Sequence, residues 1–132
     1  MNLTAKQYLQ GYLSAERRIG MHLRAIARLR ESVAGSSGAL GDRVKSSTKD
    51  SMARSVEKIV DLEREIEAEE KRQAEVKAAV QRVTDEKLRD VLDLKYIRGM
   101  TLEQTARAMG YSLGWVKHLH LDALDALEKR GF

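Results

Sequence analysis

The chain has 132 residues, the length of one domain or of one small domain with an extended element attached. It lacks proline, and 33% of its residues are charged, which favours long, solvated helices. It also lacks cysteine, which excludes disulfides and thiolate metal sites and fits a reducing cytoplasm. The polar N-terminus has no apolar run long enough for a signal peptide or a membrane span, so neither is expected.

A first long helix is predicted from Thr4 to about Ala34. Thr4 and Gln7 form a capping-box pattern at its start. An apolar stripe then follows at spacings of three and four: Tyr8, Leu9, Tyr12, Ala15, Ile19, Leu23, Ile26, Leu29 and Val33. A helix of this length spans roughly 45 Å and cannot bury such a stripe alone.

A flexible loop at residues 35–48 and a second long helix from about Lys49 to Val83 should follow. The loop is rich in Gly, Ser and Thr, which disfavour helix. The second helix has near-heptad apolar spacing: Met52, Val56, Ile59, Leu62, Ile66, Val76, Val80 and Val83. The pattern predicts an antiparallel, coiled-coil-like hairpin in which the acidic residues 61–70 face the basic residues 15–24. The same stripes can instead pair between chains, giving a dimer through a four-helix bundle.

The segment from Thr101 to Lys129 is predicted to be a helix-turn-helix. Thr101 and Gln104 form another capping box, Gly110 suits the left-handed residue that ends a helix, and Ser112 suits the cap of the next one. Small and apolar residues have the spacing of two helices that cross steeply about a glycine turn: Leu102, Ala106, Val116 and Leu119. The second helix should bury Val116, Leu119, Ala123, Leu124 and Leu127 and end at Arg130-Gly131. A preceding helix, capped by Thr84 and ending at Arg98-Gly99, should pack against these two as the third helix of the domain.

The chain offers no catalytic constellation, so we expect no enzymatic activity, cofactor or metal site. His118 and His120 lie two residues apart, about 200° around a helix, and cannot chelate one metal. The acidic residues are spread along helical surfaces without a glycine-rich phosphate cradle.

The outward positions of the second helix are instead candidates for DNA contact, because the N-terminal residues of a recognition helix meet base edges in the major groove. Lys117 can donate to guanine acceptors or to a phosphate, and His118 can donate or accept at a base edge. Thr101 and Ser112, at helix N-termini, suit phosphate contacts. Trp115 has two interpretations, base contact or packing on the first helix or a partner, and Lys117 can also be a merely solvated lysine. The full candidate set is Thr101, Ser112, Leu113, Gly114, Trp115, Lys117, His118 and Leu121.

Charge is the main difficulty for this interpretation. Residues 84–132 carry eight basic and eight acidic side chains, so the predicted reader is neutral, although non-specific affinity for DNA comes mainly from Lys and Arg. Asp122, Asp125 and Glu128 crowd the far end of the second helix and should face away from DNA or toward another protein. A helix-turn-helix with weak affinity can still bind DNA if the protein dimerises, if basic residues of the first helix also contact the DNA, or if RNA polymerase binds the protein at the promoter.

The segment LDLKYIRGMTLEQTARAMGYSLGWVKHLHLDALDAL resembles the C-terminal part of the ArpU/RinA-type phage regulators and, more distantly, region 4 of sigma factors. The first resemblance implies a small phage or prophage activator of late genes. It would bind promoter DNA, contact bacterial RNA polymerase and act at the nucleoid in the host cytoplasm. The second places base contacts on Leu113, Gly114, Lys117 and His118. Sigma factors usually have Arg, Glu, Arg and Gln there, so the resemblance implies the fold but not the target sequence.

The sequence therefore predicts an all-α protein with a helical hairpin at residues 1–83 and a three-helix DNA-binding domain at residues 84–132. A transcription regulator is the favoured function, with a dimer as the expected state. The alternatives are a small-terminase-like assembly protein, which would form a ring of many subunits, and a helical adaptor that binds protein only.

Overall fold

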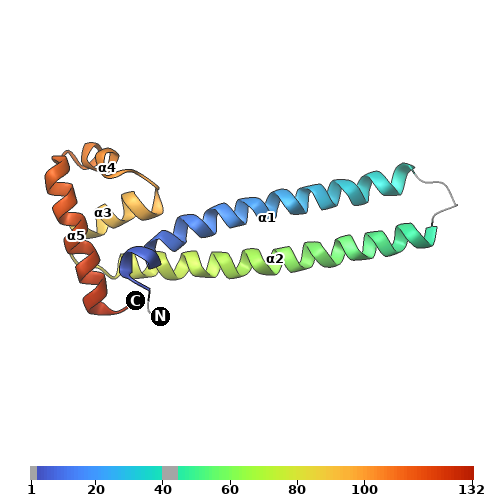
Figure 1. Cartoon of the computed structure of the whole chain (residues 1–132), viewed down its shortest axis with the longest axis horizontal. Coiled ribbons are helices and arrows are strands. Elements are labelled where there is room, and N and C mark those ends of the chain that lie inside the picture. The colour runs from blue at the N-terminus through green and yellow to red at the C-terminus, as the bar shows by residue number, and fades with distance from the viewer. Residues whose placement is uncertain (1–2, 40–44) are drawn as a thin grey trace. The chain divides into compact units, whose positions relative to one another are not determined.

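The computed structural model describes the backbone of residues 3–39 and 45–132, and the side chains of residues 3–34 and 49–132. Every regular element in this described part is helical, which confirms the predicted all-α class. Helix α1 (Ala5–Ala39) and helix α2 (Lys45–Gln81) run antiparallel and side by side (Figure 1). The predicted helical hairpin is therefore present.

The two long helices extend further than the sequence predicted. Residues 35–39 and 45–48 are helical, so the expected loop is wrong at these positions, and residues 40–44 lie outside the described residues. Gly and Ser are poor helix formers, but adding a residue to an existing helix does not repeat the cost of nucleation, and no proline interrupts the chain. The start of α1 is as predicted, since Thr4 and Gln7 exchange their capping-box hydrogen bonds at 3.0 and 3.2 Å.

Contacts divide the chain into two units, each described by itself. The hairpin unit, Arg17–Glu70, contains the middle of α1 and of α2. Across the two helices, Arg18 forms an ion pair with Glu69 at 2.8 Å, and His22 Nε2 lies 3.3 Å from a carboxylate oxygen of Glu65, which confirms the predicted register. Leu23 and Val56 of the predicted stripes are about half exposed, at 54% and 52%, because two helices alone cannot cover both flanks of each stripe.

The head unit, Met1–Glu16 with Lys71–Phe132, contains the remaining elements. Helix α3 (Glu86–Leu92) continues into a π-helical turn, η2 (Asp93–Ile97), which closes where the N–H of Arg98 donates to the carbonyl of Asp93 at 3.0 Å. Asp85, not the predicted Thr84, caps α3, and its carboxylate accepts from the backbone N–H groups of Lys87 and Leu88. A carboxylate at this position also interacts favourably with the helix dipole.

The core of the head unit crosses position 83/84, where the sequence predicted a domain boundary. Leu9 from α1, Val76 and Val80 from α2, Leu92 from α3 and Leu127 from the last helix are all within 2% of complete burial and belong to one cluster. Beside this cluster, Glu128 accepts a 2.5 Å hydrogen bond from the backbone N–H of the buried Ala5. The three-helix reader is thus built on the paired ends of α1 and α2.

Candidate nucleic-acid interface

Helix α4 (Leu102–Met109) begins and ends as the sequence predicted. The Thr101 hydroxyl accepts from the N–H of Gln104 at 3.1 Å, and the Gln104 side chain accepts from the N–H of Thr101 at 3.0 Å. Gly110 ends the helix in the left-handed conformation, at φ 72° and ψ 30°, and its N–H donates back to the last turn. Because a side chain strains this conformation, glycine is the residue that allows the chain to turn here.

Helix α5 (Leu113–Arg130) follows after two residues. The hydroxyl of Ser112 accepts from the N–H of Trp115 at 3.2 Å and caps it, as predicted. The side of α5 that faces the head core is buried: Val116, Leu119, His120, Ala123 and Leu127. Thr105 and the small Ala106 are buried on α4, where the two helices contact each other. The chain does not continue straight from α4 into α5.

The leading turns of α5 are open to solvent, as DNA contact requires. Among the candidate residues, Leu113 is half-buried and the others are exposed: Thr101, Ser112, Gly114, Trp115, Lys117, His118 and Leu121. A pocket of about 400 Å³ lies between the start of α4 and the start of α5. It brings Thr101, Leu113 and Lys117 together with Lys95 from η2.

Lys95 is a cation beside the candidate interface that the sequence did not reveal. It lies on the helix that was predicted to end at Arg98-Gly99, and no local pattern links this segment to the start of α5. Its ammonium lies 5.5 Å from the centroid of the Tyr96 ring. The same pocket includes Glu103, so its charge is mixed.

Trp115 and His118 form a stacked aromatic pair on the outer surface of α5, with ring centroids 5.3 Å apart. Trp115 remains 44% exposed, and the ring on which it stacks belongs to the same helix. His118 Nε2 also lies 3.2 Å from a carboxylate oxygen of Asp122, one turn further on. Together the two rings form an exposed amphipathic surface in the first two turns of α5, after the cap residue Ser112.

The acidic residues at the far end of α5 have local partners. Asp122 faces His118, which corrects the expectation that it points away from the candidate reader. Asp125 pairs with Lys129 at 3.0 Å, and Glu128 accepts from the start of α1. Negative charge at this end of the helix is therefore partly compensated within the head.

His120, unlike His118, is a buried structural residue. Its Nε2 lies 2.6 Å from the hydroxyl of Tyr96, and the two rings stack at 5.6 Å. Burial, with the charges of Lys95 and Lys6, lowers the pKa of His120, and burial raises the pKa of Tyr96 to about 12. The imidazole is therefore neutral at neutral pH and shares a hydrogen bond with the Tyr96 hydroxyl. This hydrogen bond joins η2 to α5.

These features define a helix-turn-helix domain: α4 and α5 are joined by the turn at Gly110, the first turns of α5 are exposed, and α3 packs against α5. Residues 85–129, about a third of the chain, match the family model described as sigma-70, region 4. Comparison with curated proteins and with solved structures gives no match. Among the described residues, no helix is both long and apolar enough to cross a membrane. The match indicates a DNA-binding helix-turn-helix regulator rather than an enzyme.

Proposed function

We propose that this protein is a sequence-specific DNA-binding transcription regulator that reads the major groove with the first two turns of α5. The observation that carries this proposal is the asymmetry of α5 beyond the Gly110 turn. Its inner side is buried against the head core, while Lys117 and His118 are exposed on the other side. A recognition helix needs both properties, because its scaffold must hold it rigidly while its reading side chains remain accessible to the DNA.

Each candidate residue has a distinct role in this interface. Lys117 and Lys95 supply positive charge for phosphates, and His118 offers a ring nitrogen to a base edge. A Cβ added at Gly114 would meet nothing within 4 Å in the protein, so this position leaves room for the close approach of a DNA backbone. Leu113 and Leu121 suit thymine methyl groups, and Thr101 and Ser112 place helix N-termini toward phosphates.

The resemblance of the chain to ArpU/RinA-type regulators supports a more specific role, the activation of late genes in a phage or prophage. Such an activator would bind promoter DNA as a homo-oligomer and contact RNA polymerase at the nucleoid of the bacterial host. Oligomerisation would also compensate for the zero net charge of residues 84–132, because two weakly binding domains on one duplex gain affinity through their effective concentration.

The test begins with selection of a binding site from random duplex oligonucleotides, followed by fluorescence titration at several salt concentrations. Lys117→Ala should weaken binding to all sequences and reduce the salt slope by about 1, as expected for one lost phosphate contact. His118→Ala should instead reduce discrimination at one base position by about 5- to 100-fold. Lys129→Ala is the matched control, since it removes a lysine from the same helix at the end away from the proposed interface.

Unchanged affinity of the Lys117→Ala/His118→Ala double variant would refute this helix as the reader. Failure of the wild-type protein to bind any duplex at low salt would instead favour a helical adaptor that binds protein only. A ring of many subunits in light scattering would favour the small-terminase-like alternative.

A further inference from the structure

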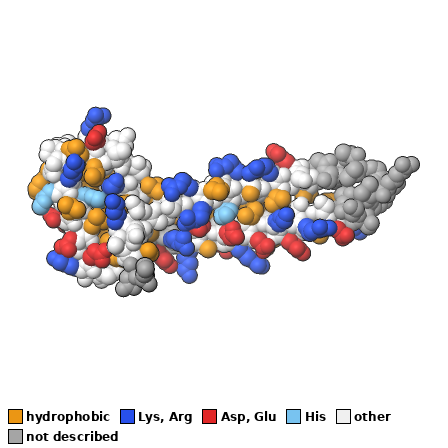
Figure 2. All heavy atoms as spheres, in the orientation of Figure 1, with side chains coloured by type: hydrophobic (Ala, Val, Ile, Leu, Met, Phe, Trp, Pro, Cys, Tyr) orange, Lys and Arg blue, Asp and Glu red, His pale blue; other side chains and the backbone are white. Residues whose placement is uncertain are grey.

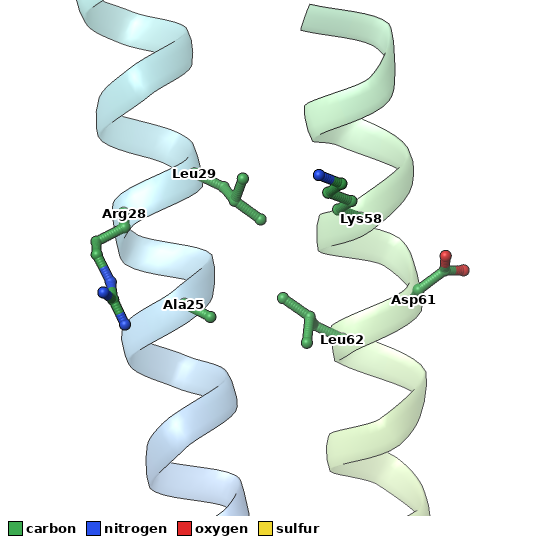
Figure 3. Close-up of a pocket in the computed structure, with 6 residues that line it drawn as sticks. All are labelled: Ala25, Arg28, Leu29, Lys58, Asp61 and Leu62. Atoms are coloured by element: carbon green, nitrogen blue, oxygen red, sulfur yellow. The ribbon is translucent and has the colours of Figure 1, made fainter. Parts of the chain in front are cut away.

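The hairpin unit has an apolar groove along one face. A pocket of about 450 Å³ between α1 and α2 is lined by Ala25, Leu29 and Leu62, with Arg28, Lys58 and Asp61 beside them. Figure 3 shows Leu29 and Leu62 directed toward each other from the two helices, with Ala25 also facing α2. All three apolar side chains remain partly exposed, since a pair of helices covers each stripe from one direction only.

The two helices that border this groove have opposite charge. Residues 17–34 carry five arginines and one glutamate, a net charge of +4, whereas residues 49–70 carry four basic and eight acidic residues, a net charge of −4. Figure 2 shows Lys and Arg along the α1 edge of this face, mainly Asp and Glu along the α2 edge, and apolar side chains between them. The α1 border of the face is thus mainly basic and the α2 border mainly acidic, with Lys58 as a basic residue on the α2 side.

Arg28 and Asp61 mark these two borders. Both are exposed, and Figure 3 shows them on the outer sides of their helices, directed away from each other. They do not face each other within one hairpin, and each lies at one border of the groove.

We propose that a second copy of this chain covers the groove, with the two hairpins face to face about a two-fold axis parallel to their helices. This operation places α1 of one protomer over α2 of its partner at both borders, so Arg28 approaches Asp61 of the other copy twice. A two-fold axis across the helices would place α1 over α1, and arginine over arginine. Charge therefore selects the first arrangement, in which each helix has antiparallel neighbours of opposite charge.

The self-complementary pattern also explains why the occupant is another copy of this chain. An unrelated amphipathic helix could fill the apolar centre but would match only one of the two charged borders. A second hairpin supplies an acidic border for the basic one and a basic border for the acidic one, together with its own apolar centre. The interface lies within Arg17–Glu70, so its measurement requires no DNA and is independent of the proposed reader.

The apolar contact is tested by sedimentation equilibrium on the full chain. Leu29→Glu places a carboxylate in the apolar contact and should raise the dimer dissociation constant at least about tenfold, because burying a charge costs more than an ion pair with Lys58 returns. Leu23→Glu is the matched control, because it makes the same change on the same helix at a leucine that does not line the groove and lies about 120° around α1. Its dimer should be as tight as that of the wild type.

A monomeric wild-type protein at its highest soluble concentration would overturn the proposal, as would dissociation by Leu23→Glu but not by Leu29→Glu. Circular dichroism checks that each variant keeps its helix content. If Leu29→Glu unfolds the hairpin, Ala25→Glu at the edge of the same groove replaces it and should also dissociate the dimer.

The orientation of the two hairpins is tested with Arg28→Glu and Asp61→Arg. Each variant alone places like charges at both borders and should dimerise more weakly than the wild type. An equimolar mixture should recover the affinity. In the mixed dimer, the carboxylate introduced at position 28 meets the guanidinium introduced at position 61, and the unchanged Arg28 of one chain meets the unchanged Asp61 of the other. Arg28→Glu chains that dimerise as tightly as the wild type, or a mixture that shows no recovery, would overturn this arrangement.

Discussion

Replacement of Gly110 by alanine tests whether the left-handed turn between α4 and α5 is needed for the head. At φ 72° an L-residue costs about 1–2 kcal/mol relative to a right-handed conformation. An added Cβ would meet nothing within 4 Å, so no steric clash contributes, and the whole effect comes from the backbone. A smaller opposing term, about 0.4–1 kcal/mol, arises because alanine restricts the unfolded chain. We expect Gly110→Ala to destabilise the head by about 1 kcal/mol.

Gly114→Ala is the matched control, because a Cβ there also meets nothing within 4 Å but the residue is helical. Alanine is a better helix former than glycine, so this variant should be more stable than the wild type by up to about 1 kcal/mol. The two substitutions, four residues apart and chemically identical, should therefore have opposite signs.

The assay is urea-induced unfolding followed by the fluorescence of Trp115, the single tryptophan of the chain, which reports on the head. Far-UV circular dichroism of the same samples distinguishes loss of the head from loss of the long helices. A Gly110→Ala variant as stable as the wild type would show that the turn does not depend on the left-handed residue. Gly114→Ala gives a second readout, because it should weaken DNA binding although it stabilises the fold.

Three further outcomes are expected. Leu9→Ala should destabilise the head by about 3 kcal/mol in the same unfolding assay, since this fully buried leucine belongs to the core cluster that includes Ala123 and Leu127 of α5. A loss below about 1 kcal/mol would show that the stability of the head does not depend on α1. Stability should fall as the pH decreases below 6.5, because the lowered pKa of His120 in the folded chain means that the unfolded chain protonates this residue more readily. A His120→Gln variant should flatten this part of the profile of stability against pH, and an unchanged profile would contradict the assignment. Thr101→Ala should cost about 1 kcal/mol through loss of the capping box, and wild-type stability would contradict that role.

The most accurate sequence predictions concerned features set by a few neighbouring residues. Thr101 and Gln104 cap α4 because their side chains reach backbone groups within one turn, and the turn at Gly110 depends only on the absence of a Cβ. The hairpin register was also predictable, because long stripes and blocks of opposite charge match in one antiparallel alignment. Local composition was misleading at residues 35–39 and 45–48, where the continuing helix outweighed the low propensity of Gly and Ser.

Tertiary structure decided what distant segments do together. No sequence spacing indicates that Tyr96 and His120 share a hydrogen bond, that Lys95 joins Thr101 and Lys117 at one pocket, or that Leu9 and α5 belong to one core. Periodicity identifies the apolar side of a helix, but which part of that side is covered depends on the partner, as the exposed Leu23 and Val56 show. The sequence by itself therefore determined the helices, their caps and the glycine turn, because these depend on interactions within a few residues. Packing between elements decided which histidine is buried and which is presented to solvent, because burial depends on the side chains that meet in space.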